Sequence, residues 1–199
     1  MASPQSGPGR EDTSATVASR LIHDGRVVHL SVDRVRFPDG SEGDLELIRH
    51  PGASAVLPVV GSPDDDDPKV LLVRQYRYAG GGYIYEVPAG LPQTGETWEQ
   101  CASRELEEEA GVVAGRLEYL TRIHTTPGFT NEVIHLFAGF ELSSGTVDRD
   151  EDEFLAVEEH RLSTVLEMVA DGRITDGKSV VTILFAARFL LGRGNATSR

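Results

Sequence analysis

The chain has 199 residues, enough for one domain with a substantial core and a small additional element. It carries 19 Lys and Arg against 32 Asp and Glu, and the net charge of -13 argues against sequence-independent binding to nucleic acid or to an anionic membrane. The single cysteine, Cys101, excludes an internal disulfide framework and fits a reducing compartment, so we expect a cytoplasmic protein. We expect neither a secretory signal nor a membrane-spanning segment, because the start lacks a basic region followed by an apolar one and no apolar run is long enough.

The first part of the chain is predicted to form a small antiparallel β element. Residues 1–14 are rich in Ser, Pro and Gly, a composition that predicts a disordered tail. Apolar and polar residues then alternate in RVVHLSVDRVRF and in GDLELIRH, and PDGSEG separates the two runs. Alternation interrupted by Pro-Asp-Gly is typical of a hairpin or meander, so residues 15–52 are predicted to form an N-terminal β meander.

Residues 53–191 are predicted to form an α/β domain, followed by a flexible tail at 192–199. The apolar runs SAVLPVV, KVLLVRQYRY and YIYEVPAG predict strands, and the acidic GSPDDDDP between the first two is interpreted as a solvated loop. A helix is predicted from Trp98 to Ala110, because Gly111 is the residue type that usually follows a helix C-terminus. Further strands are expected at 116–124, 132–142 and 154–160, and further helices at about 163–170 and 178–191. This order of elements predicts an α/β sandwich with a mixed sheet.

The predicted helix carries its glutamates in the stretch SRELEEEAG. Glu105, Glu108 and Glu109 share one face because helix neighbours lie three or four residues apart, and this leaves an inward-facing line of Ala102, Leu106 and Ala110. Arg104 is expected to pair with Glu108, which leaves Glu105 and Glu109 less compensated, while Glu107 is expected to face solvent. From these residues alone, a solvated acidic face is the ordinary explanation, and a site for a hard cation such as Mg²⁺ is the alternative.

A wider pattern favours the cation. After Gly90 the chain has five residues, Glu96, seven residues, and then RELEEEAGV, which starts at Arg104. This pattern resembles the Nudix box at every specified position, and the predicted strand, loop and helix are the setting that the box requires. The resemblance implies an α/β/α sandwich of the Nudix type. It also implies hydrolysis of a nucleoside diphosphate linked to another moiety, with Mg²⁺ or Mn²⁺ as the cofactor.

The resemblance also implies roles for residues in and beside the box. Glu105 and Glu109 match metal ligands. Glu108 matches a further carboxylate that binds metal directly or through water, and we also count it as a catalytic candidate. Ala89, immediately before the box glycine, matches the position whose backbone carbonyl ligates a metal. Two further positions match residues that orient the loop against the helix, Glu96 and Arg104.

Segments outside the box resemble the ADP-ribose pyrophosphatase subgroup. They are RQYRY, YEVPAG and TTPGFTNE, together with the N-terminal β meander. By position, the resemblance assigns Arg77 to the pyrophosphate, Glu86 to the adenine or ribose end of the substrate, and Pro127 to the residues that bind substrate. A guanidinium suits phosphate oxygens, and a surface arginine at a strand end is the alternative for Arg77.

The general base is expected in DRDEDEF, an acidic stretch well after the box. In the ADP-ribose subgroup the base comes from such a loop, so the candidates are Glu151, favoured by its offset to the following strand, and Glu153. A base takes the proton of the attacking water, whose pKa a bound metal ion lowers. The alternative is a solvated loop that supplies no base.

The expected function is therefore metal-dependent hydrolysis of ADP-ribose to AMP and ribose 5-phosphate by a Nudix pyrophosphohydrolase. One alternative is a pyrophosphatase for other nucleoside diphosphate sugars. Another is a Nudix-like sensor that binds ADP-ribose without cutting it, although such sensors usually have a damaged box or an attached DNA-binding module. We also expect a homodimer whose pocket takes residues from both chains, since the meander is poorly stable alone and packs across the dimer in similar pyrophosphatases. Neither nucleic acid nor a membrane is expected as a partner.

Overall fold

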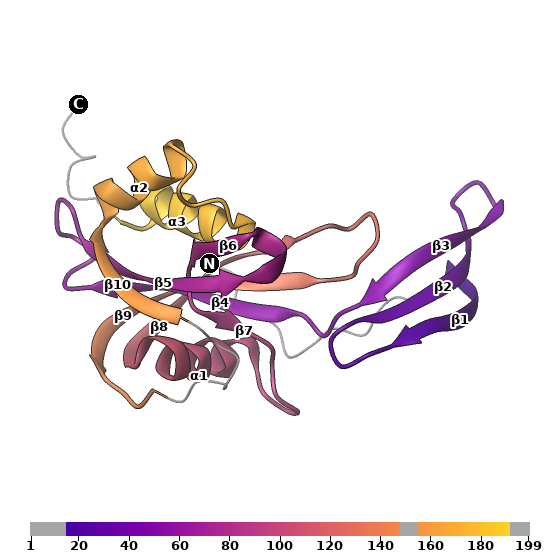
Figure 1. The fold of residues 1–199 in the computed structure, drawn as a ribbon, viewed down its shortest axis with the longest axis horizontal. Helices are drawn as coiled ribbons and strands as arrows, with labels where there is room; N and C mark the ends of the chain where they lie inside the picture. The colour runs from indigo at the N-terminus through magenta and orange to yellow at the C-terminus, as the bar shows by residue number, and fades with distance from the viewer. Residues whose placement is uncertain (1–14, 148–154, 192–199) are drawn as a thin grey trace.

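The computed structural model describes residues 15–147 and 155–191 (Figure 1). Its first part, the N-terminal sheet, has three antiparallel strands, β1 (Thr16–Asp24), β2 (His29–Arg36) and β3 (Glu42–Arg49), in the order β1-β2-β3. The predicted N-terminal antiparallel element is therefore confirmed. The alternation in the sequence located β2 and β3 but not β1, because eight of the nine β1 residues are exposed and the strand has no buried apolar face to mark it.

The second sheet is mixed. Its main strands are β4 (Ala53–Val60), β5 (Lys69–Arg77), β8 (Val112–His124), β9 (Val133–Ser144) and β10 (Leu155–Arg161), in the order β10-β5-β4-β9-β8. Two shorter strands, β6 (Gly82–Glu86) and β7 (Ala89–Gly90), pair with β5 and β4. A short 3-10 helix, η2 (Tyr78–Gly80), connects β5 to β6. Strands β4 and β9 run parallel whereas the other pairs are antiparallel, so the predicted mixed sheet is confirmed.

Helices cover both faces of the second sheet (Figure 1). Helix α1 (Trp98–Ala110) packs on one face, and α2 (Leu162–Ala170) and α3 (Gly177–Phe189) pack on the other. The buried side chains between α1 and the sheet include Val56, Ala102, Leu106 and Phe137. The larger core on the other face includes Leu57, Leu136, Val165 and Ile183. The predicted α/β/α sandwich is confirmed, with Ala102 and Leu106 facing inward as expected.

The ends of the helices follow from local sequence. Thr97 and Gln100 form a capping box at the start of α1, in which each side chain accepts a hydrogen bond from the backbone of the other. Gly111 ends α1 with a left-handed φ of 69°, which glycine adopts without strain. The predicted bounds of α1 are confirmed. Helix α3 begins one residue before the predicted 178 because Asp176 caps its first turn.

Some predictions concern residues outside the described ranges. These are the disordered tail at 1–14, the flexible tail at 192–199, and the two candidate bases, Glu151 and Glu153. The division of the chain at residue 52 stays a prediction. Within the described ranges, no helix is long and apolar enough to cross a bilayer.

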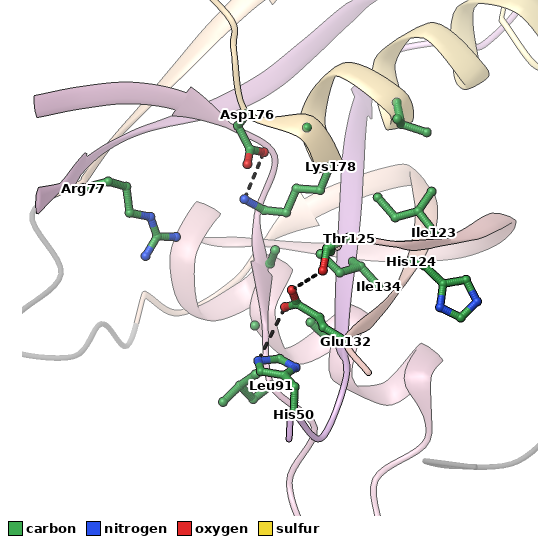
Figure 2. Close-up of a pocket in the computed structure, with 15 residues that line it drawn as sticks. His50, Arg77, Leu91, Ile123, His124, Thr125, Glu132, Ile134, Asp176 and Lys178 are labelled. Carbon is green, nitrogen blue, oxygen red and sulfur yellow. Dashed lines mark hydrogen bonds and ion pairs between the residues drawn. The ribbon is translucent and has the colours of Figure 1, made fainter. Parts of the chain in front are cut away.

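The loop between β8 and β9 joins the N-terminal sheet to the second sheet. The Ile48 amide donates a hydrogen bond to the Phe129 carbonyl at 2.8 Å, and Ile48 forms an isolated parallel bridge with Thr130. The His50 amide donates to Asn131 Oδ1 at 2.7 Å. This junction brings His50 and the β8–β9 loop to one wall of a pocket (Figure 2).

Candidate active site

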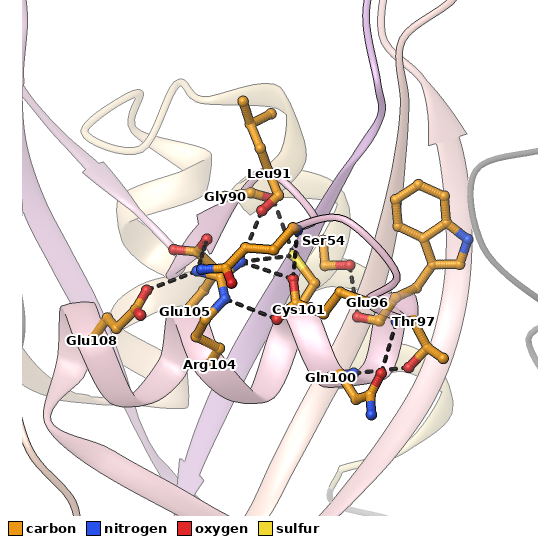
Figure 3. A network of polar contacts seen from close by, with 12 residues as sticks. Ser54, Gly90, Leu91, Glu96, Thr97, Gln100, Cys101, Arg104, Glu105 and Glu108 are labelled. Atoms are coloured by element: carbon orange, nitrogen blue, oxygen red, sulfur yellow. Dashed lines mark hydrogen bonds and ion pairs between the residues drawn. The ribbon is translucent and has the colours of Figure 1, made fainter.

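Arg104, in α1, forms hydrogen bonds to the loop that precedes the helix (Figure 3). Its Nε and Nη2 donate hydrogen bonds to Glu96 Oε1 and Oε2 at 2.8 and 3.0 Å, and Nη2 also donates to the Leu91 carbonyl at 2.8 Å. Its Nη1 donates to Glu105 Oε1 and to Glu108 Oε2, each at 2.7 Å. The expected pair with Glu108 is present. The expectation that Glu105 is less compensated is wrong, because the same nitrogen reaches both carboxylates.

Glu105 and Glu109 are buried, at 9% and 3% exposure. The Ala89 amide donates a hydrogen bond to Glu109 Oε2 at 3.0 Å. Glu105 lies against Gly90, where an added Cβ would come within 2.1 Å of Glu105 Oε1, so any larger residue at this position would displace the Glu105 carboxylate. A solvated acidic face is therefore the wrong explanation for these two residues, whose carboxylates lie against β7.

The cluster offers the kind of donor atom that a divalent cation binds, although its side chains are not arranged as a ligand set. Arg104 carries one positive charge and contacts the carboxylates of Glu96, Glu105 and Glu108, so negative charge is in excess around it. All of the expected ligands, three carboxylates and a backbone carbonyl, are oxygen donors, which hard divalent cations prefer. In the part of the chain that the structure describes, no three acidic, histidine or cysteine side chains converge as a ready ligand set. The glutamates are instead held by Arg104 and by the Ala89 amide.

Glu107 lies on a different side of α1. It is partly buried, and its Oε1 accepts a hydrogen bond from the Thr146 amide at 3.1 Å. An added Cβ at Gly145 would lie 3.0 Å from Glu107 Cγ, so the side chain packs along the segment that follows β9. The prediction that Glu107 faces solvent is wrong, because this side chain accepts a backbone hydrogen bond from that segment.

A pocket of about 710 Å³ opens beside the box (Figure 2). Near the box, the pocket is lined by Arg77, Ala89 and Gly90. The start of α3 contributes two charged residues, Asp176 and Lys178. The junction between the two sheets contributes the polar residues His50, Thr125 and Glu132, and the apolar lining includes Ala53, Ile123, Ile134 and Val181. The volume lies within the usual range of small-molecule sites. The pocket thus combines charged groups near the box with hydrogen-bonding groups from the junction between the two sheets.

Glu132 is held in a defined orientation in the pocket lining. Thr125 Oγ1 donates to Glu132 Oε2 at 2.7 Å, and His50 Nε2 lies 3.5 Å from Glu132 Oε1 (Figure 2). The Gly52 amide donates to His50 Nδ1 at 3.1 Å, so a neutral His50 carries its proton on Nε2, towards Glu132. The oriented carboxylate can accept hydrogen bonds from ligand hydroxyl groups.

The substrate residues predicted from the sequence have different surroundings. Arg77 lines the pocket. Glu86 is 2% exposed, and its Oε1 and Oε2 accept hydrogen bonds from Arg77 Nε at 2.7 Å and Nη2 at 3.0 Å. Pro127 is exposed in the β8–β9 loop and does not line the pocket. The structure thus brings Arg77 together with Ala89, whose amide contacts Glu109, while the roles assigned to these residues stay predictions.

Several polar residues of the pocket were not predicted from the sequence, namely His50, Thr125, Glu132, Asp176 and Lys178. One of them had a local signal, because Asp176 precedes the apolar run that forms α3 and so stands at a capping position. His50 and Glu132 had none, since they come from opposite sides of the junction and meet only in the folded chain. Lys178 had none either, because its partner Glu86 is 92 residues away in the chain.

The chain is similar to known proteins in sequence and in fold. A family model described as "NUDIX domain" matches residues 50–181. The chain is 39% identical to the ADP-ribose pyrophosphatase of Bacillus subtilis (strain 168) over 172 residues, which are 85% of this chain and 90% of that protein. It is 37% identical, over the same shares, to the methanol dehydrogenase activator of Bacillus methanolicus. The fold is similar to a crystal structure of an ADP compounds hydrolase, with a TM-score of 0.74 and 22% identity over 88% of this chain and 92% of that one.

Proposed function

We propose that the chain, which belongs to the Nudix family, hydrolyses the pyrophosphate bond of ADP-ribose to give AMP and ribose 5-phosphate. The observation that carries this proposal is the position of the box beside the pocket. Ala89 lines the pocket and its amide contacts Glu109, while Arg77 lines the same pocket. The similarity to an ADP-ribose pyrophosphatase over 85% of the chain supports the choice of substrate.

Nudix hydrolases generally need divalent metal ions, and we assign Mg²⁺ or Mn²⁺ to this chain. The proposed ligands are Glu105, Glu108, Glu109 and the backbone carbonyl of Ala89. When bound, the ions would neutralise pyrophosphate charge and lower the pKa of a coordinated water. Glu96 accepts two hydrogen bonds from Arg104, so part of the positive charge of Arg104 is directed away from the proposed metal ligands.

The remaining proposed roles concern substrate and base. Arg77 would bind the pyrophosphate, since its guanidinium lines the pocket and its side chain is 44% exposed. Glu132 would accept hydrogen bonds from sugar hydroxyl groups, and Pro127 would shape the loop that carries it. The general base is proposed to be Glu151, with Glu153 second, and both lie outside the described residues. A base at either position would take the proton of the attacking water.

A substrate panel tests this function. The purified protein with Mg²⁺ or Mn²⁺ is supplied in turn with ADP-ribose, GDP-mannose and UDP-glucose, and the products are separated by chromatography. We expect AMP and ribose 5-phosphate from ADP-ribose at a rate well above the turnover of the other two. Faster turnover of another sugar nucleotide would favour the wider pyrophosphatase function, and binding of ADP-ribose without products would favour the sensor.

We further propose a homodimer formed through the N-terminal sheet. Several large apolar side chains of this sheet and its β1–β2 turn are exposed in the single chain, among them Leu21 at 60%, Val27 at 67% and Leu45 at 48%. A second copy that covers them would remove apolar surface from water. A monomer by light scattering at micromolar concentration would contradict this arrangement. The cytoplasmic location and the absence of nucleic acid and membrane partners stay predictions.

A further inference from the structure

The buried carboxylate of Glu86 is held by two cations from distant parts of the chain. Arg77, at the end of β5, donates to both carboxylate oxygens at 2.7 and 3.0 Å. Lys178, in the first turn of α3, donates to Glu86 Oε2 through Nζ. Only 2% of the Glu86 side chain and 12% of the Lys178 side chain are exposed, whereas 44% of the Arg77 side chain is exposed.

Lys178 is itself fixed by the start of α3. Asp176 Oδ2 accepts a hydrogen bond from Lys178 Nζ at 3.0 Å and another from the Ser179 amide at 3.0 Å. Ser179 Oγ in turn accepts a hydrogen bond from the Val87 amide at 2.8 Å. The first turn of α3 is therefore attached to the segment between Glu86 and Ala89, which leads directly into the box.

The charges of this group balance only with the lysine present. Glu86 and Asp176 contribute two negative charges, and Arg77 and Lys178 contribute two positive ones. Burial raises the pKa of Glu86, but the hydrogen bond from Arg77 and the charge of Lys178 outweigh this effect and hold the pKa below its ordinary value. Glu86 is thus a buried anion at neutral pH, and such an anion is tolerated only when it is paired.

Arg77 and Lys178 therefore differ in what they offer to a ligand. The ammonium of Lys178 is largely buried and contacts two carboxylates, Glu86 and Asp176. Arg77 uses Nε and Nη2 for Glu86, while its more exposed side chain reaches the pocket. Without Lys178, the positive charge of Arg77 would have to compensate Glu86 alone.

We propose that Lys178 is a positioning residue for phosphate binding. It shares the Glu86 carboxylate with Arg77 and fixes the position of that carboxylate. The charge of Arg77 and its remaining hydrogen-bond donors are then left for the pyrophosphate. This inference rests on the proposed function, in which Arg77 binds the pyrophosphate of ADP-ribose. Lys178 acts through Glu86 and does not itself contact the substrate. The Glu86 carboxylate, assigned from the family resemblance to the adenine or ribose end, serves here as the support of Arg77.

A double-mutant cycle tests the inference. The variants are Lys178→Met, Glu86→Gln, the double variant, and Lys178→Arg, which keeps the charge. Lys69→Met is the matched control, because it removes an exposed ion pair with Glu159 at 2.7 Å on the β5–β10 edge. For each protein, kcat and KM for ADP-ribose are measured with Mg²⁺, and the Kd for ADP-ribose is measured by calorimetry without added metal. Thermal unfolding verifies that each variant is folded.

We expect Lys178→Met to raise KM and Kd by roughly tenfold to a hundredfold, with a smaller change in kcat. Lys178→Arg should restore most of the affinity, and Lys69→Met should leave it unchanged. In the Glu86→Gln background, Lys178→Met should cause little further loss, because the lysine acts through that carboxylate. The inference is overturned if Lys178→Met lowers affinity by the same factor in both backgrounds, which would indicate direct substrate contact, or if it does not change affinity.

The affinity measurements need no turnover, so the two proposals can fail separately. A wild-type protein that binds ADP-ribose but does not hydrolyse it would contradict the proposed function, and the Kd values would still decide the role of Lys178. A wild-type protein that hydrolyses ADP-ribose and shows no coupling between Lys178 and Glu86 would contradict this inference alone. A protein that does not bind ADP-ribose would contradict both.

Discussion

The Glu109 carboxylate accepts a hydrogen bond from the Ala89 amide at 3.0 Å, although 20 positions separate the two residues in the chain. This bond links α1 to β7. It keeps the last glutamate of the box beside the residue whose carbonyl is proposed as a metal ligand. Gly90 allows the neighbouring approach of Glu105 to the same strand.

The contact between Gly90 and Glu105 predicts the effect of one methyl group. In Gly90→Ala, the new Cβ would lie 2.1 Å from Glu105 Oε1, so the buried carboxylate must move. We expect the free energy of unfolding to fall by about 1–3 kcal/mol and kcat to fall roughly a hundredfold, because the carboxylate that must move is a proposed metal ligand. Chemical denaturation and steady-state kinetics measure both effects. Gly128→Ala, where an added Cβ meets nothing within 4 Å, is the control for stability. A Gly90→Ala protein with the wild-type kcat would contradict the proposed place of Glu105.

The Arg104 contacts predict a link between stability and metal. Arg104→Met would leave the carboxylates of Glu96, Glu105 and Glu108 without their shared cation. We expect the free energy of unfolding to fall by about 2–4 kcal/mol, because removing one partner of a largely buried ion pair leaves the other charges without compensation from it. Added Mg²⁺ should recover part of this loss, since at the proposed site it would bind the folded protein and not the unfolded chain.

The control for Arg104 is an exposed arginine. Arg36→Met removes a pair with Glu42 in which the arginine side chain is 61% exposed, and it should change stability by less than about 0.5 kcal/mol. Urea denaturation with and without Mg²⁺ measures both variants. If Arg104→Met were as stable as Arg36→Met, the structural role given to Arg104 would be wrong.

His135 predicts a pH dependence of stability. It stacks on Trp98 with ring centroids 4.3 Å apart, and burial, aided by repulsion from Arg122, lowers its pKa from 6.5 to about 4. Between these pH values the unfolded chain binds a proton that the folded protein does not. The stability contributed by neutral His135 is therefore complete above about pH 6.5 and is lost as the pH falls towards 4.

Replacing His135 should remove this dependence. His135→Phe keeps an aromatic ring against Trp98. Between pH 6.5 and 4, the fall in the free energy of unfolding should be about 2–3 kcal/mol smaller for this variant than for the wild type. Denaturant unfolding at several pH values measures the difference, and His23→Phe, at an exposed position, is the control. Parallel curves for wild type and His135→Phe would show that His135 does not stay neutral in the folded protein.

Local chemistry explains which parts of the fold and site could be predicted. The bounds of α1 depend on neighbouring residues, because the cap at Thr97 and the left-handed Gly111 act within one turn. The Arg104–Glu105 contact could not be predicted from helix spacing, since adjacent residues do not face each other and only the long guanidinium brings them together. Strand β1 escaped prediction because it is exposed on both faces and lacks alternation.

The pocket depended on contacts between distant segments. His50 meets Glu132 only because the β8–β9 loop pairs with the end of β3. Lys178 meets Glu86 across 92 residues because the first turn of α3 lies against the segment that follows β6. The family resemblance identifies the box residues from the sequence alone, whereas the polar residues that the junction adds to the pocket are evident only in the folded structure.

The most direct test of the central claim compares two glutamates of α1. Glu109→Gln replaces a buried carboxylate proposed as a metal ligand, whereas Glu99→Gln changes an exposed residue in the first turn of the same helix. AMP and ribose 5-phosphate released from ADP-ribose with Mg²⁺ are measured for both variants and the wild type. For the wild type and for Glu99→Gln, we predict that AMP and ribose 5-phosphate are released in equal amounts and that the two proteins have the same rate. For Glu109→Gln, we predict a rate at least about a hundredfold lower, with the fold intact by circular dichroism. Wild-type turnover by Glu109→Gln, or no AMP from the wild type, would contradict the account.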